Sequence, residues 1–397
     1  MILILIPIII TAFFSVIELN IPNQKRLQNQ LYQIVFYTVF FIVGIKYYYG
    51  PDIHLYVPLY ENIESPLYIW KNGSSVGKGI EIGYLYYCSI LKWIGCNFWL
   101  FTFSITCIYF YAIYQCFKHI EKYKITALFA LTVFESNILF FEFRQAIAVS
   151  LFILGILAFL EKKYIKYLFY VAISIFFHKS AIFVVVLSFI ILFVPTIKYS
   201  RNYYLSLCLI IISGIFVSFG DILTLLTVSL PIPLSTVNSI LHHLDVENNF
   251  QTILILYCTT FVCLYQYSIN TDNSKKRFYI LILSFFLIIA IFYKYWFFLN
   301  RVRSFFSPLI IVFIINELSK TKLKLIFIKQ TLVILLFCFA FIYTRGLYLI
   351  ETNSKSKVLA ATTLFSRINK TEEEIKKTNI DKAVLYFKKE YLKNHKR

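Results

Sequence analysis

Long apolar runs fill most of this chain, and short polar or charged segments separate them. A helix that crosses a bilayer needs about 20 mostly apolar residues, and these runs approach or reach that length. The pattern therefore predicts an all-α, polytopic transmembrane helical bundle of about 12 spans, with 10–13 compatible because several runs are short. The runs lie near residues 2–19, 31–48, 97–117, 125–141, 145–160, 164–177, 180–195, 203–219, 251–269, 278–297, 304–316 and 325–345.

The remaining segments complete this plan. The first run lacks a basic n-region and a small-residue cleavage site, so we expect residues 1–19 to be a retained span. Residues 80–95 contain Gly83 and Lys92 and favour an interfacial or re-entrant helix. We expect a transmembrane domain over residues 1–345, with large outer loops at 49–96 and 220–250. A basic tail follows over 346–397, and its acid-first, base-last segment predicts a surface helix over 371–394.

The amino-acid composition also indicates a protein that is embedded in a membrane. The chain is 59% hydrophobic and 15% charged, against about a quarter charged in soluble domains. Its formal net charge of +19 would suggest nucleic acid in a soluble protein, but here the basic residues follow the topology.

One alternating set of loops carries most of this charge. It holds 17 basic and four acidic residues, whereas the other set holds seven basic and eight acidic. Because Lys and Arg accumulate in cytoplasmic loops, the first set is predicted to be cytoplasmic and no nucleic acid partner is expected. The first set comprises residues 20–30, 118–124, 161–166, 196–202, 270–277 and 317–329. The tail, with 12 basic and six acidic residues, conflicts with its predicted outer position, although long segments translocate largely regardless of charge.

Ionisable residues gather on the predicted outer face. They are Asp52, Glu81, Arg144, His178, Arg301 and Arg303. Each has a simpler explanation: an Arg can reach lipid phosphates, a His can lie at the interface, and Asp52 can cap a turn. Together they favour a site, because ionisable groups near the apolar slab are costly and usually face a cavity.

Metal chemistry has weaker support. The eight cysteines are scattered through apolar runs without paired spacing, which favours free, buried thiols. His242, His243, Asp245 and Glu247 fit a solvated loop better than a metal site. No metal site and no cofactor is predicted.

At these positions the chain resembles the EpsG-like family of polysaccharide polymerases, which act in the manner of Wzy polymerases. The resemblance lies in an ordered set of short motifs between residues 50 and 306. The motifs are Gly50-x-Asp52-x-x-x-Tyr56, Glu81-x-Gly83-Tyr84, Arg144-Gln145-x-x-Ala148, His178-x-Ser180-Ala181, and Arg301 with Arg303 before Phe305-Phe306.

The resemblance implies an enzyme of the bacterial cytoplasmic (inner) membrane, with its active side facing the periplasm or exterior. It would transfer a glycan from undecaprenyl pyrophosphate to the end sugar of a fresh lipid-linked repeat unit, making O-antigen, capsule or exopolysaccharide. Its partners would be both lipid-linked glycans, the bilayer, and candidate chain-length regulator and flippase proteins. On this basis the catalytic candidates are His178, Arg144, Asp52 and Glu81, and the substrate-binding candidates are Arg301, Arg303, Gln145, Tyr56 and Lys179.

The residue types suit this chemistry in their own right. Arg binds pyrophosphate bidentately and stays charged, and pre-placed cations lower the barrier to its departure. His178, Asp52 or Glu81 could accept the hydroxyl proton.

Two other functions remain open. A lipid-linked oligosaccharide flippase would place ionisable residues at several depths, whereas these candidates lie on one face. A glycosyltransferase using polyprenyl-phosphate sugars usually carries paired acidic residues in its first outer loop, and Asp52 and Glu81 do not exclude it. A membrane acyltransferase with His178 as base has no further support.

The topology makes a direct prediction. A reporter enzyme that is active only outside the cytoplasm should be silent when fused after Lys276 and active when inserted within residues 50–80, because basic residues mark the cytoplasmic loops. Activity of the Lys276 fusion would refute the assigned orientation.

Overall fold

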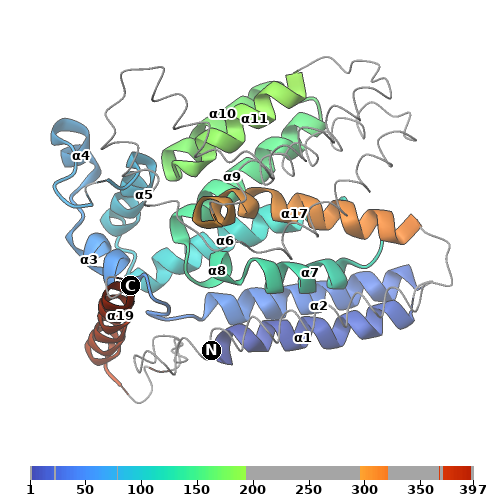
Figure 1. Cartoon of the computed structure of the whole chain (residues 1–397), viewed down its shortest axis with the longest axis horizontal. Coiled ribbons are helices and arrows are strands. Elements are labelled where there is room, and N and C mark those ends of the chain that lie inside the picture. The colour runs from blue at the N-terminus through green and yellow to red at the C-terminus, as the bar shows by residue number, and fades with distance from the viewer. Residues whose placement is uncertain are drawn as a thin grey trace. The chain divides into compact units, whose positions relative to one another are not determined.

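The computed structural model describes residues 2–21, 24–77, 79–193, 296–320, 366 and 370–394. Every longer regular element in these residues is a helix, which confirms the predicted all-α class (Figure 1). The helices are α1 (Ile2–Asn20), α2 (Lys25–Gly44), α3 (Ile53–Asn62), α4 (Pro66–Asn72), α5 (Ile82–Trp93), α6 (Phe98–Phe117), α7 (Lys124–Phe134), α8 (Ser136–Phe140), α9 (Phe143–Leu160), α10 (Tyr164–Phe177), α11 (Ser180–Phe193), α17 (Trp296–Lys320) and α19 (Glu372–Asn394).

Three described helices are long and apolar enough to cross a membrane: α1, α6 and α9. The apolar helices α7 and α10 are shorter. The runs predicted at 203–219, 251–269 and 325–345, nearly all of 278–297, and the outer loop 220–250 lie outside the described residues. The count of about 12 spans therefore stays a prediction.

The chain divides into two compact units. The first contains residues 1–159, 163–179 and 307–397, and the second contains 160–162 and 180–306. In the second unit the structure describes α11 and the first part of α17, which carries Arg301 and Arg303, both partly exposed.

The core of the first unit is built on α1, which packs against α7 and α2. The Thr11 hydroxyl on α1 and the Thr132 hydroxyl on α7 are hydrogen-bonded at 3.1 Å within the apolar packing. Such a contact lets two helices share polar groups where lipid offers no partner.

The carboxylate of Glu18 ties the end of α1 to the start of α7. It accepts hydrogen bonds from the Ile125 and Thr126 backbone N–H groups, both at 2.9 Å, and from the Thr126 hydroxyl at 3.0 Å. The first N–H groups of a helix have no partner within the helix, so a buried carboxylate supplied by another helix satisfies them. Glu18 is 1% exposed, and it caps the start of α7 although 107 residues of sequence separate it from Ile125.

The run predicted as one span over 125–141 is instead broken. Helix α7 ends at Phe134, the buried Glu135 leaves helical geometry with ψ 24°, and α8 begins at Ser136. The N–H groups of Phe141 and Glu142 both turn back to the Asn137 carbonyl, at 2.7 and 3.1 Å. The sequence marks this break only by the short polar segment Glu135-Ser136-Asn137 within an otherwise apolar run.

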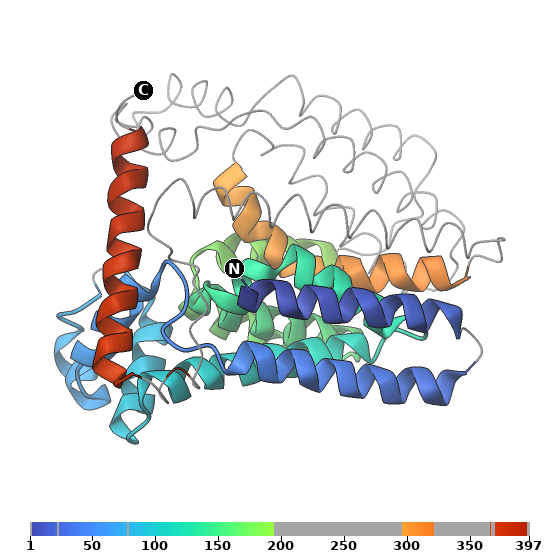
Figure 2. The same ribbon diagram turned by 90° about the horizontal axis from the view of Figure 1, so that it is seen from below.

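The first unit has two chemically different ends. At one end, called the basic end, lie Glu18, the start of α7 and the Asn316 side chain, which donates to the His119 carbonyl at 2.9 Å. At the other, the loop end, α3, α4, α5 and α19 gather beyond the long helices (Figures 1 and 2). Most of the predicted loop 49–96 is thus short helix.

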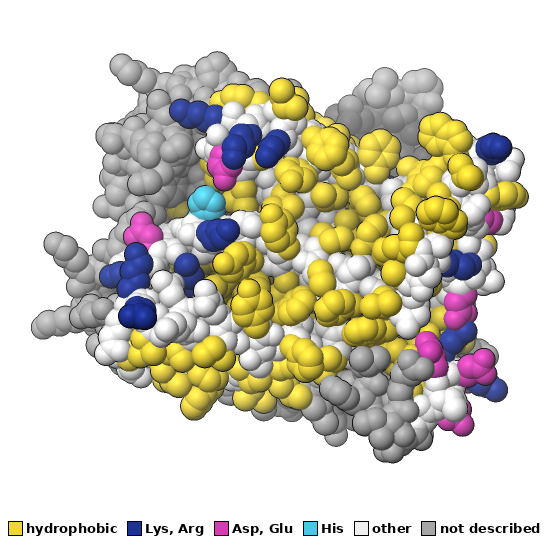
Figure 3. Space-filling model, turned by 180° about the vertical axis from the view of Figure 1, so that it is seen from behind, with side chains coloured by type: hydrophobic (Ala, Val, Ile, Leu, Met, Phe, Trp, Pro, Cys, Tyr) yellow, Lys and Arg dark blue, Asp and Glu magenta, His cyan; other side chains and the backbone are white. Residues whose placement is uncertain are grey.

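Apolar side chains cover the surface between charged margins. Figure 3 shows hydrophobic side chains across the middle of one face, Lys and Arg along one edge, and mixed charges at the opposite edge. Exposed apolar residues include Tyr37 and Phe41 of α2 and Phe169 of α10. This distribution is typical of a surface that faces lipid.

The Glu18 contact predicts a specific loss of stability. Glu18→Ala leaves buried donors on α7 without an acceptor, and we expect a cost of roughly 2–3 kcal/mol, measured as a lower midpoint of thermal aggregation in detergent. Asn20→Ala, at an exposed position where the side chain bonds the Val16 carbonyl, is the matched control. Equal midpoints for both variants would contradict the capping role.

Candidate active site

The candidate site lies at the loop end, where the beginnings of α5 and α9 meet the end of α10. Glu81 directly precedes α5, Arg144 is the second residue of α9, and His178 and Lys179 follow α10. Helix ends are where a membrane helix bundle can present ionic groups and unpaired backbone groups without exposing them to lipid.

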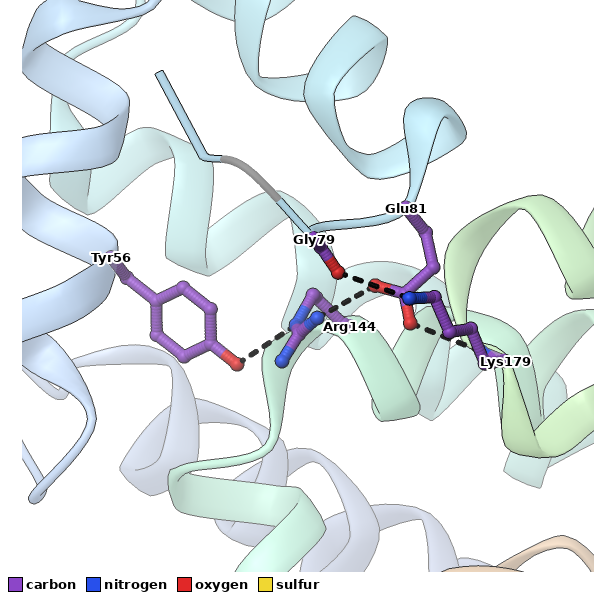
Figure 4. A network of polar contacts seen from close by, with 5 residues as sticks. All are labelled: Tyr56, Gly79, Glu81, Arg144 and Lys179. Carbon is purple, nitrogen blue, oxygen red and sulfur yellow. Dashed lines mark hydrogen bonds and ion pairs between the residues drawn. The ribbon is translucent and has the colours of Figure 1, made fainter. Parts of the chain in front are cut away.

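An ion pair forms the centre of this site. Arg144 Nη1 donates to Glu81 Oε2 at 2.6 Å, and the two side chains are 24% and 7% exposed. The other carboxylate oxygen, Oε1, accepts from the Lys179 backbone N–H at 3.1 Å, while Lys179 Nζ reaches the Gly79 carbonyl at 3.4 Å (Figure 4). Glu81 thus links three helix ends through one side chain.

The charge of Glu81 is maintained by its partners. Burial by itself raises the pKa of this carboxyl, but the Arg144 guanidinium, the Lys179 N–H and nearby His178 hold the pKa below its ordinary value. The carboxylate consequently stays ionised at neutral pH and available to orient Arg144.

Tyr56 of α3 approaches Arg144 from the other side. Arg144 Nε points to the Tyr56 hydroxyl at 3.5 Å, a long contact (Figure 4). Burial and the nearby Asp52 charge raise the pKa of Tyr56 to about 12 against the opposing effect of Arg144, so the phenol stays neutral. Glu81 and Tyr56 leave the Nη2 end of the guanidinium without an acceptor among the described residues. That end can donate to an anion.

Two glycines allow this arrangement. A Cβ on Gly83 would lie 2.7 Å from the Phe176 carbonyl oxygen, so α5 and α10 touch at a point where a side chain has no room. Gly50 has φ +105°, and a Cβ there would collide with the Phe141 ring. Both glycines belong to the motifs singled out in the sequence, and close packing accounts for them.

Lys46 is a neighbour of the site that the sequence analysis missed. It is 4% exposed, donates to the Leu139 carbonyl at 2.6 Å and lies 5.2 Å from the centre of the Phe143 ring, next to Arg144. The available signal was a lysine placed within an otherwise apolar run, just before the Tyr47-Tyr48-Tyr49 turn.

The structure brings together five of the candidate residues: Tyr56, Glu81, Arg144, His178 and Lys179. Asp52 lies near Tyr56 at the start of α3, where its side chain makes no capping hydrogen bond to the helix. Gln145 is buried in α9. Arg301 and Arg303 belong to the second unit, and their predicted role in substrate binding stays a prediction.

The described residues contain no group of three or more His, Cys, Asp or Glu side chains arranged to hold a metal ion. The polar cluster of His242, His243, Asp245 and Glu247 lies outside the described residues.

Comparison with known proteins identifies the family. The model of the EpsG family matches residues 29–354, most of the chain. The chain belongs to the EpsG family. No curated protein and no solved structure matches it. Membership in the EpsG family indicates a membrane polysaccharide polymerase, and all the site residues described above fall within the matched segment.

The close contact between Gly83 and the Phe176 carbonyl can be tested by mutation. Gly83→Ala forces α5 away from the Phe176 carbonyl, and we expect a loss of about 1–3 kcal/mol together with lower polymer synthesis, because Glu81 moves from Lys179. Ile90→Ala, at an exposed position of the same helix, is the control. Wild-type stability and polymer yield in Gly83→Ala would contradict the close approach.

Proposed function

We propose that this protein polymerises lipid-linked oligosaccharide repeat units at the outer face of the bacterial cytoplasmic membrane. The donor is a glycan on undecaprenyl pyrophosphate, and the acceptor is the end sugar of a new lipid-linked unit. The observation that supports this most directly is Arg144, a guanidinium fixed by Glu81 with one end open for an anion.

The transfer joins two sugars and releases a pyrophosphate. The acceptor hydroxyl oxygen forms a bond to the donor's anomeric carbon, while the bond from that carbon to the pyrophosphate oxygen breaks. The bonding pair leaves with undecaprenyl pyrophosphate, where negative charge develops. The open end of Arg144 suits this charge, because a preorganised cation in a partly buried site stabilises it without reorganisation.

The hydroxyl proton passes to His178 or Asp52. His178 is buried beside Glu81, and Asp52 lies beside Tyr56. Glu81 has both oxygens engaged, so its contacts fit orienting Arg144 better than accepting the proton. Tyr56 and Lys179 border the same space and suit contacts to sugar hydroxyls or phosphate.

A deletion strain tests the function. We expect it to retain the single repeat unit on lipid or on the cell surface and to lose the ladder of longer chains, because assembly and flipping of one unit precede polymerisation. Loss of even the single unit would favour a flippase or a sugar-adding transferase. A full ladder would refute the polymerase proposal. In the complemented strain, an intact ladder with His178→Ala would exclude His178 as the required base.

Arg144 offers the sharper prediction. Arg144→Lys keeps the positive charge but loses the planar fork, so it should reduce polymerisation almost as much as Arg144→Ala, by about a hundredfold. The measurement is chain-length distribution per amount of protein inserted in the membrane. Lys71→Ala on α4, which removes an exposed cation at the same end, is the control. Normal chain length in Arg144→Ala at wild-type insertion would exclude the role.

A further inference from the structure

The C-terminal helix lies beyond the segment matched by the family model and packs on the site region. The match ends at residue 354, whereas α19 spans Glu372–Asn394 and contacts α3. Its buried residues are Ile375, Asn379 and Ala383, four apart, which form a stripe on one helix face. Figure 2 shows α19 running across the loop end, roughly perpendicular to α1 and α2.

Polar contacts fix α19 at two places. The Asn379 side-chain amide donates to the Tyr48 carbonyl at 3.0 Å, and the Tyr48 hydroxyl donates to Glu372 Oε1 at 3.1 Å. Lys376 forms an ion pair with Glu61 near the end of α3. The helix therefore holds both Tyr48 and Glu61, and the chain between them carries Asp52 and Tyr56.

The backbone of Tyr48 has an unfavourable conformation. Its φ is +46°, in the left-handed region that residues with a side chain rarely occupy. Its ring stacks on Phe98 with centroids 5.1 Å apart and planes at 11°. Such a conformation persists where the surroundings impose it, and Asn379 contributes the hydrogen bond that engages the Tyr48 carbonyl. Tyr48 comes immediately before Tyr49-Gly50-Pro51-Asp52, so its geometry sets the path into α3.

We propose that Asn379 is a positioning residue of the polymerase. By holding Tyr48, while Lys376 holds Glu61, α19 sets α3 so that Tyr56 faces Arg144 with Asp52 beside Tyr56. The C-terminal helix accordingly lies on the same side of the membrane as residues 50–80, despite the basic excess of the tail. This inference rests on the proposed function for its catalytic consequence but not for the docking itself.

The division of contacts predicts a kinetic signature. Arg144 is held by Glu81, and Glu81 is held in turn by the Lys179 N–H, none of which lies on α19, so donor binding should survive when α19 detaches. When α19 detaches, α3 and the side chains it carries into the site would shift. Small misplacements of reacting groups slow the chemical step strongly. Detachment should thus lower kcat by about tenfold to a hundredfold with KM within about twofold.

The docking is tested with the native residues. A water-soluble carbodiimide condenses the Glu61 carboxyl with the Lys376 amine into an amide, with the reagent leaving as its urea. Both side chains are partly exposed, at 39% and 30%, so the reagent can reach them. We expect a linked Glu61–Lys376 peptide in mass spectra of treated membranes. It should be absent in Lys376→Arg, which keeps the charge but cannot form the amide. No linked peptide in the wild type would overturn the docking.

The positioning role is tested with Asn379→Asp, an isosteric change that replaces the donor with an acceptor facing the Tyr48 carbonyl. The control is Thr378→Ala, at the adjacent exposed position. Turnover of a lipid-linked oligosaccharide by purified full-length protein should show the lower kcat for Asn379→Asp alone. An unchanged kcat, or a raised KM alone, would overturn the role. If Asn379→Asp inserts poorly, Asn379→Ser, which retains a shorter donor, should restore both insertion and part of kcat, and failure to do so also counts against the role.

The two proposals fail differently. If the wild-type protein does not elongate the glycan, the function is wrong, and the linked peptide still reports whether α19 docks. If the wild type elongates and Asn379→Asp equals Thr378→Ala, the positioning role alone is wrong.

Discussion

The arrangement of helices at the loop end depends on the hydrogen bonds that the Glu81 carboxylate accepts. The Glu81 carboxylate accepts hydrogen bonds from the Arg144 guanidinium of α9 and from the backbone N–H that follows α10, and Glu81 itself directly precedes α5. Taking an ion pair out of water is costly, and the cost is offset when further hydrogen bonds satisfy both charges. Glu81 meets that condition with both oxygens engaged. Among the described residues, the Nη2 end of Arg144 has no acceptor, and this asymmetry supports the binding role proposed for it.

This interaction requires close backbone packing elsewhere. Glu81 reaches Lys179 because α5 touches α10 at Gly83, where the neighbouring carbonyl excludes any Cβ. On the opposite side, Gly50 lets the chain pass the Phe141 ring on its way into α3. The short motifs in this sequence thus combine two kinds of residue: ionic groups that contact one another and glycines that let their helices approach.

The sequence predicted the features that depend on local composition. Apolar runs located α1, α6, α9 and α10 to within a few residues and α2 more coarsely, and ordered motifs singled out Glu81 and Arg144. It could not pair them, because 63 residues separate Arg144 from Glu81 and their meeting depends on the contact at Gly83. The Glu18 cap is nonlocal in the same way. The helices α3 and α4, and α8 after the break at Glu135, have too few turns for a helical period to stand out in the sequence.

Under the proposed function, the site would bind an anion near the lipid boundary at modest cost. Arg144 occupies the first turn of α9, where the helix dipole already creates positive potential. The positive charge of Arg144 is unfavourable in that potential and is poorly solvated, but the negative charge of Glu81 compensates for both effects. In the reaction we propose, a pyrophosphate would meet Arg144 and the helix terminus together, while Glu81 keeps the guanidinium oriented. Replacing Glu81 by a neutral residue would therefore raise the local charge and still weaken productive binding, because orientation rather than net charge limits this site.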